Sequence, residues 1–417
     1  MRETSRYLEK HQLFAFQIEV EPASGLGVVV VIPCFSEPDL LTTLDSLAAC
    51  DRPGCEVEVL VVVNGSEQSS QETHDLNRAT LARFEQWVAG VDTPGVRFFA
   101  VDHPRLPARH AGVGLARKIG MDEAVNRLAR SASGEGVVAC LDADCRVEPN
   151  YLVEIEQYFR IHPGIQAASI HYEHPLEGHD NSAAIALYEL HLRYYVWAQR
   201  YAGLPYAHQT VGSSMAVRSE AYCRQGGMNR RKAGEDFYFL QKFSESLGSI
   251  TQTCVVPSPR ESSRVPFGTG KAMADARCRD QLTYDPRIFD QLRQLLDLTD
   301  QLARATPGDS SLTAGLTDWL KGFLEQQAFP EALAEIQDNT TDLASFRKRF
   351  LRWFNAFRAL KCVHFAVDNG YPRVPVPEAA AAMLARLEIE LTPEQDSARG
   401  LLAIYRQLDR DGVAGAR

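Results

Sequence analysis

Two carboxylates stand one residue apart directly after a short apolar run. The run from Val137 to Leu141 contains no polar residue, and Asp142 and Asp144 follow it. Such a run predicts a strand that is buried on both faces, as in a parallel sheet. The side chains of residues i and i+2 in an extended segment point the same way, so both carboxylates can contact the same ligand. Their oxygens suit Mg²⁺ or Mn²⁺, although two solvated acids in a polar turn would show the same pattern.

Three further segments carry residues that could act on a ligand. Gly112 precedes a predicted helix whose start could receive an anion close to Arg117, although a plain turn would look the same. Glu235 and Asp236 begin another predicted helix, where N-terminal capping alone explains two acids. The basic, glycine-bearing segment 260–271 could close on phosphates, or it could be an ordinary surface loop. Its candidate phosphate contacts are Arg260, Arg264 and Lys271.

The elements that must position these residues follow an alternating order. Apolar, β-branched runs predict strands, and the amphipathic stretches between them predict helices. The predicted strands span 28–32, 57–63, 96–101 and 137–141, and the predicted helices span 40–49, 71–88 and 114–129. This order predicts an α/β fold with a mostly parallel sheet, flanking helices and right-handed crossovers. In such sheets ligands bind at the carboxyl ends of the strands, where the acids stand.

Further segments complete the expected organisation. Residues 1–25 read as a lead-in with a short amphipathic segment around 13–20. Residues 209–218 predict another strand, with Gly212 at a point where another group comes close to the strand backbone. From about residue 276 the pattern becomes mainly helical, so we expect an N-terminal lead-in 1–25, a main domain 26–275 and a helical C-terminal region 276–417.

One stretch of the helical region, 346–361, carries aromatic residues at helical spacing beside basic ones. A basic amphipathic helix can lie on an anionic membrane surface. It can equally dock on the main domain with its apolar side buried. We favour docking, and peripheral membrane contact through 346–361 stays open.

Bulk properties narrow the class of protein. The formal net charge of −10 at pH 7 argues against nucleic acid as a partner, because nucleic-acid-binding proteins are typically basic. Nine cysteines are scattered singly, which is typical of thiols in a reducing compartment. The N-terminus has no signal-peptide core, and no apolar run approaches the roughly 20 residues that span a bilayer. We expect a cytoplasmic protein, peripheral to the membrane if 346–361 binds lipid; the oligomeric state is not predicted.

Taken together, the motifs resemble the family 2 glycosyltransferases, which have the GT-A fold, over about residues 26 to 275. The matching segments are Pro33-Cys34-Phe35-Ser36-Glu37, Asn64-Gly65-Ser66, Gly112 to Lys118, Asp142-Ala143-Asp144, Glu235-Asp236 and Arg260 to Arg264. Three features depart from the family pattern. Phe35 and Ser36 replace a Tyr-Asn pair, Asn64 stands where the family has an acid that holds the base, and no tryptophan follows Arg264. The missing tryptophan indicates that the chain is not a typical processive synthase.

The resemblance implies an inverting, metal-dependent transfer of a sugar from a nucleotide-sugar donor, a UDP- or GDP-sugar, to a hydroxyl acceptor. Asp142 and Asp144 would hold Mg²⁺ or Mn²⁺. Asp236 would be the general base, and Glu235 would orient it or the acceptor. The implied donor contacts are Pro33, Phe35, Glu37, Asn64, Gly112, Arg117, Asp142, Arg260, Arg264 and Lys271.

Three other functions fit these residues less well. A nucleotidyltransferase would typically need a glycine-rich, basic loop directly after the first strand, and segment 33–39 has neither glycine nor a basic residue. A metal-dependent phosphatase with Asp142 as nucleophile would need that acid on the first strand. A non-catalytic scaffold that binds a partner through its helical C-terminus would not need two acid pairs.

Overall fold

The computed structural model describes residues 2–178, 180–260, 281–306 and 310–412. These residues group into two compact units, each described separately. The sheet unit takes its described residues from 1–185, 208–276 and 409–412, and the helical unit takes them from 186–207 and 277–408. The predicted boundary near residue 276 coincides with a change of unit, whereas 186–207 group with the helical unit. The functional domain boundaries stay a prediction.

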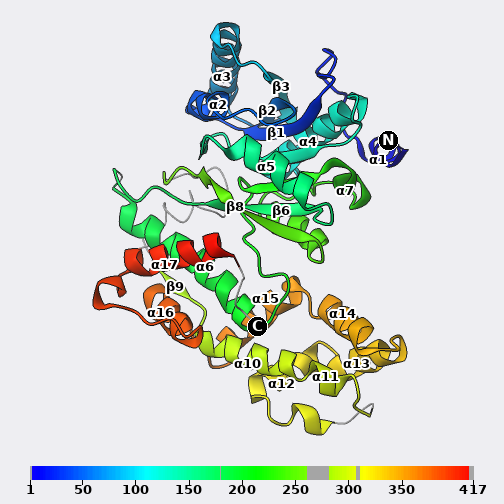
Figure 1. Ribbon diagram of the computed structural model, residues 1–417, viewed down its shortest axis with the longest axis vertical. Coiled ribbons are helices and arrows are strands. Elements are labelled where there is room, and N and C mark those ends of the chain that lie inside the picture. Colours follow the sequence, from blue (N-terminus) through cyan, green and yellow to red (C-terminus); the bar gives the residue numbers. More distant parts are fainter. Residues whose placement is uncertain (1, 179, 261–280, 307–309, 413–417) are drawn as a thin grey trace. The chain divides into compact units, whose positions relative to one another are not determined.

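The sheet unit is built on eight strands in the order β3-β2-β1-β4-β7-β6-β8-β5 (Figure 1). The strands are β1 (Leu26–Cys34), β2 (Glu56–Ser66), β3 (Val96–Leu106), β4 (Val137–Cys140), β5 (Arg146–Val147), β6 (Ala167–Tyr172), β7 (Met215–Arg218) and β8 (Leu247–Val256). Four neighbouring pairs are parallel and three are antiparallel. The predicted α/β class with a mostly parallel sheet is confirmed.

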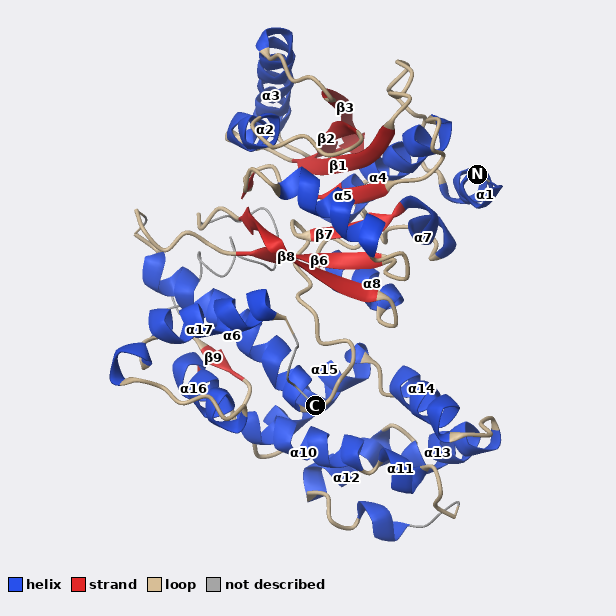
Figure 2. Ribbon diagram, viewed as in Figure 1, coloured by secondary structure: helices blue, strands red, loops and turns tan. Residues whose placement is uncertain are grey.

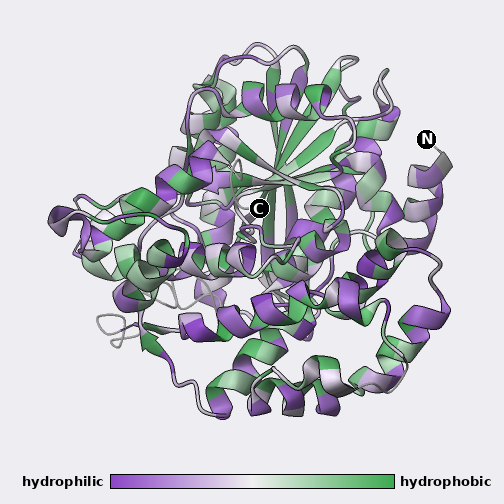
Figure 3. Cartoon of the chain, turned by 60° about the horizontal axis from the view of Figure 1, so that its bottom comes forward, coloured by the Kyte–Doolittle hydropathy of each residue, from purple (hydrophilic) through white to green (hydrophobic). Residues whose placement is uncertain are grey.

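The central strands are buried on both faces, as their unbroken apolar runs predict. Val29, Val30 and Val31 of β1 and Val138 of β4 are fully buried. In Figure 3 the strands of this sheet are coloured mainly as hydrophobic residues. Strands of this kind must be covered on both sides, which is the reason for the alternating helices.

The helices of the sheet unit follow the predicted order with small differences in their ends. They are α1 (Arg2–His11), α2 (Leu40–Ala48), α3 (Gln71–Gly90), α4 (Val113–Arg130), α5 (Tyr151–Ile161), α7 (Ser219–Arg224) and α8 (Glu235–Leu240). Helix α4 packs on β1, β2 and β4.

Two local details differ from the prediction. The lead-in contains helix α1, which the sequence patterns do not predict, and Tyr7 of α1 donates a hydrogen bond of 2.8 Å to the buried Asp122 of α4. Residues 209–214 form a loop, and only Met215–Arg218 form a strand. The first difference arises because a buried polar contact far along the chain holds α1, which no local pattern reveals.

The helical unit is almost entirely helix (Figure 2). It contains α6 (Ser182–Tyr201) from residue 186 onward, α10 (Pro286–Asp297), α11 (Thr299–Leu302), α12 (Asp318–Gln326), α13 (Phe329–Asp338), α14 (Leu343–Trp353), α15 (Ala356–Asp368), α16 (Val376–Arg386), most of α17 (Ala398–Asp411), and the short antiparallel strands β9 (Leu282–Thr283) and β10 (Val374–Pro375). The predicted helical C-terminal region is confirmed.

The basic amphipathic stretch forms α14 and the start of α15. Phe346, Phe350 and Phe354 are buried, and α14 packs against α11 and α13 within the helical unit. The apolar side is therefore covered by neighbouring helices of its own unit. Peripheral membrane contact through 346–361 stays a prediction. In the described part of the chain, no helix combines the length and the apolar character that a membrane crossing requires.

Candidate active site

Parallel pairing brings the predicted motifs to one edge of the sheet. Strand β1 lies between β2 and β4, with Cys34 opposite Val63 and Val31 opposite Cys140. The loops that leave the carboxyl ends of these three strands therefore begin side by side. Two of these loops carry Glu37 and the Asp142-Ala143-Asp144 turn, and Asn64 lies near the carboxyl end of β2.

The backbone of the Asp142–Asp144 turn is held from two sides. The Cys145 amide donates a hydrogen bond of 3.1 Å to the Asp142 carbonyl, and Thr43 Oγ1 of α2 donates one of 2.9 Å to the Ala143 carbonyl. The side chains keep access to solvent, with exposed fractions of 39% for Asp142 and 25% for Asp144. The turn is thus fixed while both carboxylates remain accessible.

Arg117 joins the two predicted acid pairs. Its side chain is almost completely buried, and its Nη2 donates to Asp142 Oδ1 at 2.5 Å while its Nη1 donates to Glu235 Oε1. A Cβ atom on Gly212 would come within 2.4 Å of Arg117 Nη1, so only glycine leaves room for the guanidinium. The close approach predicted at Gly212 is confirmed, and the group that approaches is this guanidinium.

Arg260 makes a second bridge beside the first. Its Nη1 donates to Asp39 Oδ2 at 2.8 Å, and its Nη2 donates to Asp144 Oδ2 at 3.1 Å and also to Glu37. Arg260 is the one predicted residue of the 260–271 segment that lies within the described part of the chain. Arg264 and Lys271 lie outside the described residues.

Burial changes the proton affinity of the acid pair on α8. Desolvation raises the pKa of the Glu235 carboxyl to about 7, although Arg117 acts in the opposite direction. Desolvation also raises the pKa of Asp236, again against the effect of Arg117. Raised pKa values make both carboxylates stronger bases than exposed acids are.

The remaining predicted donor contacts have simpler surroundings. The Asn64 carbonyl accepts a hydrogen bond of 2.9 Å from Asn77 of α3, whose Oδ1 accepts from the Ser36 amide. A Cβ atom on Gly112 would meet the Lys232 backbone at 3.1 Å, so the chain itself takes up the space beside this glycine. Pro33 is buried and Phe35 is partly exposed at the same edge.

The structure thus gathers seven predicted residues into one charged cluster: Glu37, Arg117, Asp142, Asp144, Glu235, Asp236 and Arg260. Sequence reasoning missed Asp39, Thr43 and Asn77, which hold the cluster through hydrogen bonds and an ion pair. Asp39 is the residue that precedes α2 as its N-cap, and its side chain makes no capping bond. No motif distinguishes Thr43 or Asn77 in the sequence, because both act through backbone groups far along the chain.

The carboxylate oxygens that follow the carboxyl end of β4 suit a divalent cation that prefers oxygen ligands. Asp142 and Asp144 offer carboxylate oxygens that are partly exposed, and Mg²⁺ or Mn²⁺ is commonly held by one or two such carboxylates together with phosphate oxygens. The cluster as a whole has five carboxylates and two guanidiniums, an excess of negative charge that favours a cation. These residues therefore fit the predicted metal.

Solved structures offer only distant similarities to this chain. S. aureus TarS 1–349 in complex with UDP-GlcNAc is 16% identical, with 92% of this chain and 90% of that chain covered and a TM-score of 0.39. The mannosyltransferase PcManGT from Pyrobaculum calidifontis in complex with GDP-Man and Mn²⁺ is 16% identical, with 98% and 94% covered and a TM-score of 0.37. GalNAc-T7 with UDP, GalNAc and Mn²⁺ is 14% identical, with 84% and 58% covered and a TM-score of 0.37.

Sequence comparison gives the decisive result. No curated protein matches the chain. The model of the family described as glycosyltransferase like family 2 matches residues 25–248, which is more than half of the 417 residues and contains both acid pairs. The chain therefore belongs to the glycosyltransferase-like family 2 and is a glycosyltransferase.

Proposed function

We propose that the chain transfers a sugar from a UDP- or GDP-sugar to a hydroxyl acceptor, with inversion at the sugar C1 and with Mg²⁺ or Mn²⁺ bound at Asp142 and Asp144. The observation that carries the proposal is the Arg117 bridge. It ties the carboxylate pair at the end of β4 to the pair on α8, so that a metal-type site and two candidate bases form one centre.

The two arginines have a direct role in donor binding. When bound, the metal ion would neutralise charge on the departing nucleoside diphosphate as a Lewis acid. Arg260 would exchange part of its contact with Asp144 and Glu37 for a phosphate oxygen, which a guanidinium can bind in bidentate fashion. We propose Pro33, Phe35, Glu37, Asn64, Gly112, Arg117, Arg264 and Lys271 as the other donor contacts.

Asp236 is the proposed general base. As the acceptor oxygen attacks C1, the bond from C1 to the phosphate oxygen breaks and the hydroxyl proton passes to the Asp236 carboxylate. A base in this position gains from a raised pKa, and burial raises that of Asp236. Glu235, held by Arg117, would keep the start of α8 in place beside the acceptor.

The first test measures donor binding and transfer separately. The full chain is titrated with UDP-sugars and GDP-sugars in Mn²⁺ and in EDTA, with melting temperature as the binding signal and donor turnover as the activity signal. Asp142→Ala combined with Asp144→Ala should abolish the metal-dependent rise. Asp236→Asn should keep donor binding and lower turnover by roughly 10²–10⁴-fold, the usual contribution of a general base.

A matched control is Asp92→Asn, because Asp92 is an exposed aspartate in the loop between α3 and β3. It should leave both signals unchanged. Full turnover by Asp236→Asn would refute the base assignment. Donor binding without any turnover in the unaltered chain, across a panel of hydroxyl acceptors, would favour the non-catalytic scaffold.

A further inference from the structure

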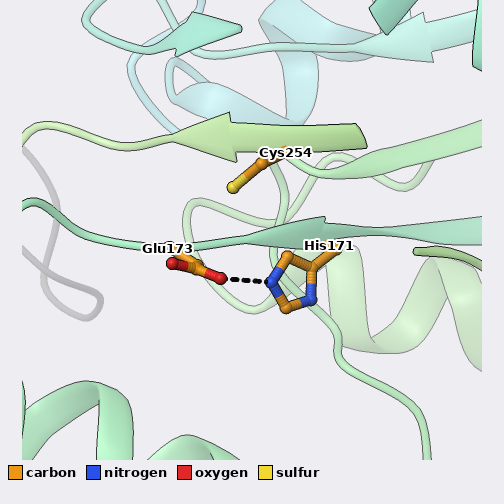
Figure 4. Close-up of side chains that lie close together, drawn as sticks. All are labelled: His171, Glu173 and Cys254. Atoms are coloured by element: carbon orange, nitrogen blue, oxygen red, sulfur yellow. Dashed lines mark hydrogen bonds and ion pairs between the residues drawn. The ribbon is translucent and has the colours of Figure 1, made fainter. Parts of the chain in front are cut away.

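A second cluster of ligand-type side chains lies between strands β6 and β8 (Figure 4). His171 is in β6, Glu173 follows that strand, and Cys254 is in β8. The imidazole nitrogen, the carboxylate oxygen and the sulfur lie within 4.8 Å of one another, and His171 Nε2 is 2.8 Å from Glu173 Oε1. In the described part of the chain this is the one group of three such residues whose donor atoms approach so closely.

An irregularity in the sheet creates this arrangement. His171 and Glu173 are two residues apart in an extended segment, so they point to the same side. The β6–β8 pairing passes from Ile170 opposite Ile250 to Tyr172 opposite Val255, so β8 uses more residues than β6 over the same distance. Such bulges redirect side chains, and this one places Cys254 on the side of His171 and Glu173.

The backbone around Cys254 is fixed on both flanks. The Glu148 amide donates a hydrogen bond of 3.1 Å to the Cys254 carbonyl, and the Glu173 amide donates one of 2.9 Å to the Val255 carbonyl. The cysteine is therefore held between β5 and the end of β6. A metal site needs ligands that are positioned in advance, and these contacts supply that order.

The surroundings of the carboxylate also resemble those of a metal ligand. Arg410, in the last turn of α17 and within the sheet unit, donates to Glu173 Oε1 from Nη2 at 2.9 Å and from Nε at 3.1 Å. Ligating carboxylates are commonly oriented by a hydrogen-bond donor from outside the metal shell. His171 and Cys254 are 6% and 3% exposed, so the nitrogen and the sulfur are shielded from bulk water.

We propose that His171 Nε2, the Glu173 carboxylate and Cys254 Sγ bind a Zn²⁺ ion, with a fourth position left for water. A nitrogen, a sulfur and an oxygen donor suit Zn²⁺, whereas Mg²⁺ prefers oxygen alone. This site is separate from the proposed catalytic metal at Asp142 and Asp144 and does not depend on the transferase mechanism.

Binding changes the protonation of two ligands. The Cys254 thiol loses its proton to solvent and binds as thiolate. The proton with which His171 Nε2 donates to Glu173 leaves that nitrogen for solvent, and the neutral ring carries its proton on Nδ1, so that Nε2 can donate its lone pair. The hydrogen bond between His171 and Glu173 is replaced by two bonds to the metal. The ion then joins β6 to the bulge of β8 and should raise the melting temperature of the sheet unit.

The test uses the full chain after removal of metal with a chelator. Titration with Co²⁺ should produce thiolate-to-metal absorption in the near ultraviolet, and Zn²⁺ should displace Co²⁺ at one ion per chain. Cys254→Ser should abolish the absorption and weaken Zn²⁺ binding by at least about 100-fold, more than the loss typical for residues outside the metal shell. His171→Gln should weaken Zn²⁺ binding to a similar degree and provides the test if Cys254→Ser does not fold.

Two further variants complete the experiment. Cys223→Ser removes another buried thiol of the sheet unit and should bind both ions as the unaltered chain does. Asp142→Ala combined with Asp144→Ala should keep the thiolate absorption. The proposal is overturned if the unaltered chain shows no thiolate absorption, if Cys254→Ser binds Zn²⁺ as tightly as the unaltered chain, or if the double alanine variant loses the absorption.

Discussion

Replacing Arg117 with glutamine should destabilise the sheet unit strongly, and by an amount that depends on pH. Arg117 is 2% exposed and compensates Glu235, which is 3% exposed. Removing one partner of a buried ion pair typically costs about 3–5 kcal/mol because the remaining charge is left uncompensated. At pH 8 Glu235 of the unaltered chain is mainly ionised, since its pKa is about 7 with Arg117 present, so the loss of Arg117 should cost most there, as an uncompensated charge or as the uptake of a proton by Glu235.

At pH 5.5 the expected cost is smaller. Burial has raised the folded pKa of Glu235 above its ordinary value of 4.5, so below pH 7 the folded state holds the carboxyl protonated and neutral. Loss of Arg117 then removes hydrogen bonds but leaves no buried charge on Glu235, which corresponds to about 1–3 kcal/mol. The same linkage means that the unaltered sheet unit gives up stability as the pH rises from 4.5 through 7.

The assay is urea unfolding in EDTA at pH 8 and at pH 5.5, with hydrogen exchange of β1 and β4 peptides to assign the transition to the sheet unit. Arg117→Gln combined with Glu235→Gln should recover part of the loss at pH 8. Arg78→Gln is the matched control, because Arg78 and Asp75 form an exposed pair worth less than about 1 kcal/mol. An equal cost of Arg117→Gln at both pH values, with no recovery in the double variant, would refute the reasoning.

Three other outcomes can be checked in the same way. Gly212→Ala should destabilise the sheet unit by about 1–3 kcal/mol in urea unfolding, because the new Cβ would press on Arg117; an unchanged midpoint would contradict this. Burial lowers the pKa of His191 from 6.5 to about 4, so the free energy of unfolding of the helical unit should fall by up to about 3 kcal/mol as the pH falls from 6.5 to 4. His191→Gln should flatten this dependence of stability on pH, and an unaltered dependence would contradict the role of His191. Phe350→Ala should cost the helical unit about 3–5 kcal/mol in thermal unfolding, whereas the exposed Phe357→Ala should cost little; equal effects would show that the burial argument fails.

Local sequence patterns predicted most of the central strands of the sheet. The runs at 28–32, 57–63 and 137–141 became β1, β2 and β4 because short runs rich in apolar and β-branched residues favour strands that are covered on both faces. The ends of two predicted strands differ from the structure, since β4 stops at Cys140 and β7 begins only at Met215. Such ends depend on which neighbouring strand continues the pairing, and the local sequence does not contain that information.

The sequence indicated which residues belong to the candidate site but not which of them contact one another. Asp142, Asp144, Glu235 and Asp236 could be named because the two acid pairs occur in the order that the family motifs have. Each pair alone would also fit a polar turn or an N-terminal cap. That Arg117 joins them could not be read from the sequence. Its position in α4 gives only helical neighbours, and both of its partners lie on other elements.

The sequence by itself determined the class of fold, the order of strands and helices, and the family, because each of these depends on patterns within short segments. Only the tertiary structure decided which charges meet. It placed Arg260 on Glu37 and Asp144, filled the space beside Gly212 with a guanidinium, and brought Cys254 to His171 through a bulge. These contacts join residues far apart along the chain, and their geometry depends on strand register and helix packing, which local propensity does not specify.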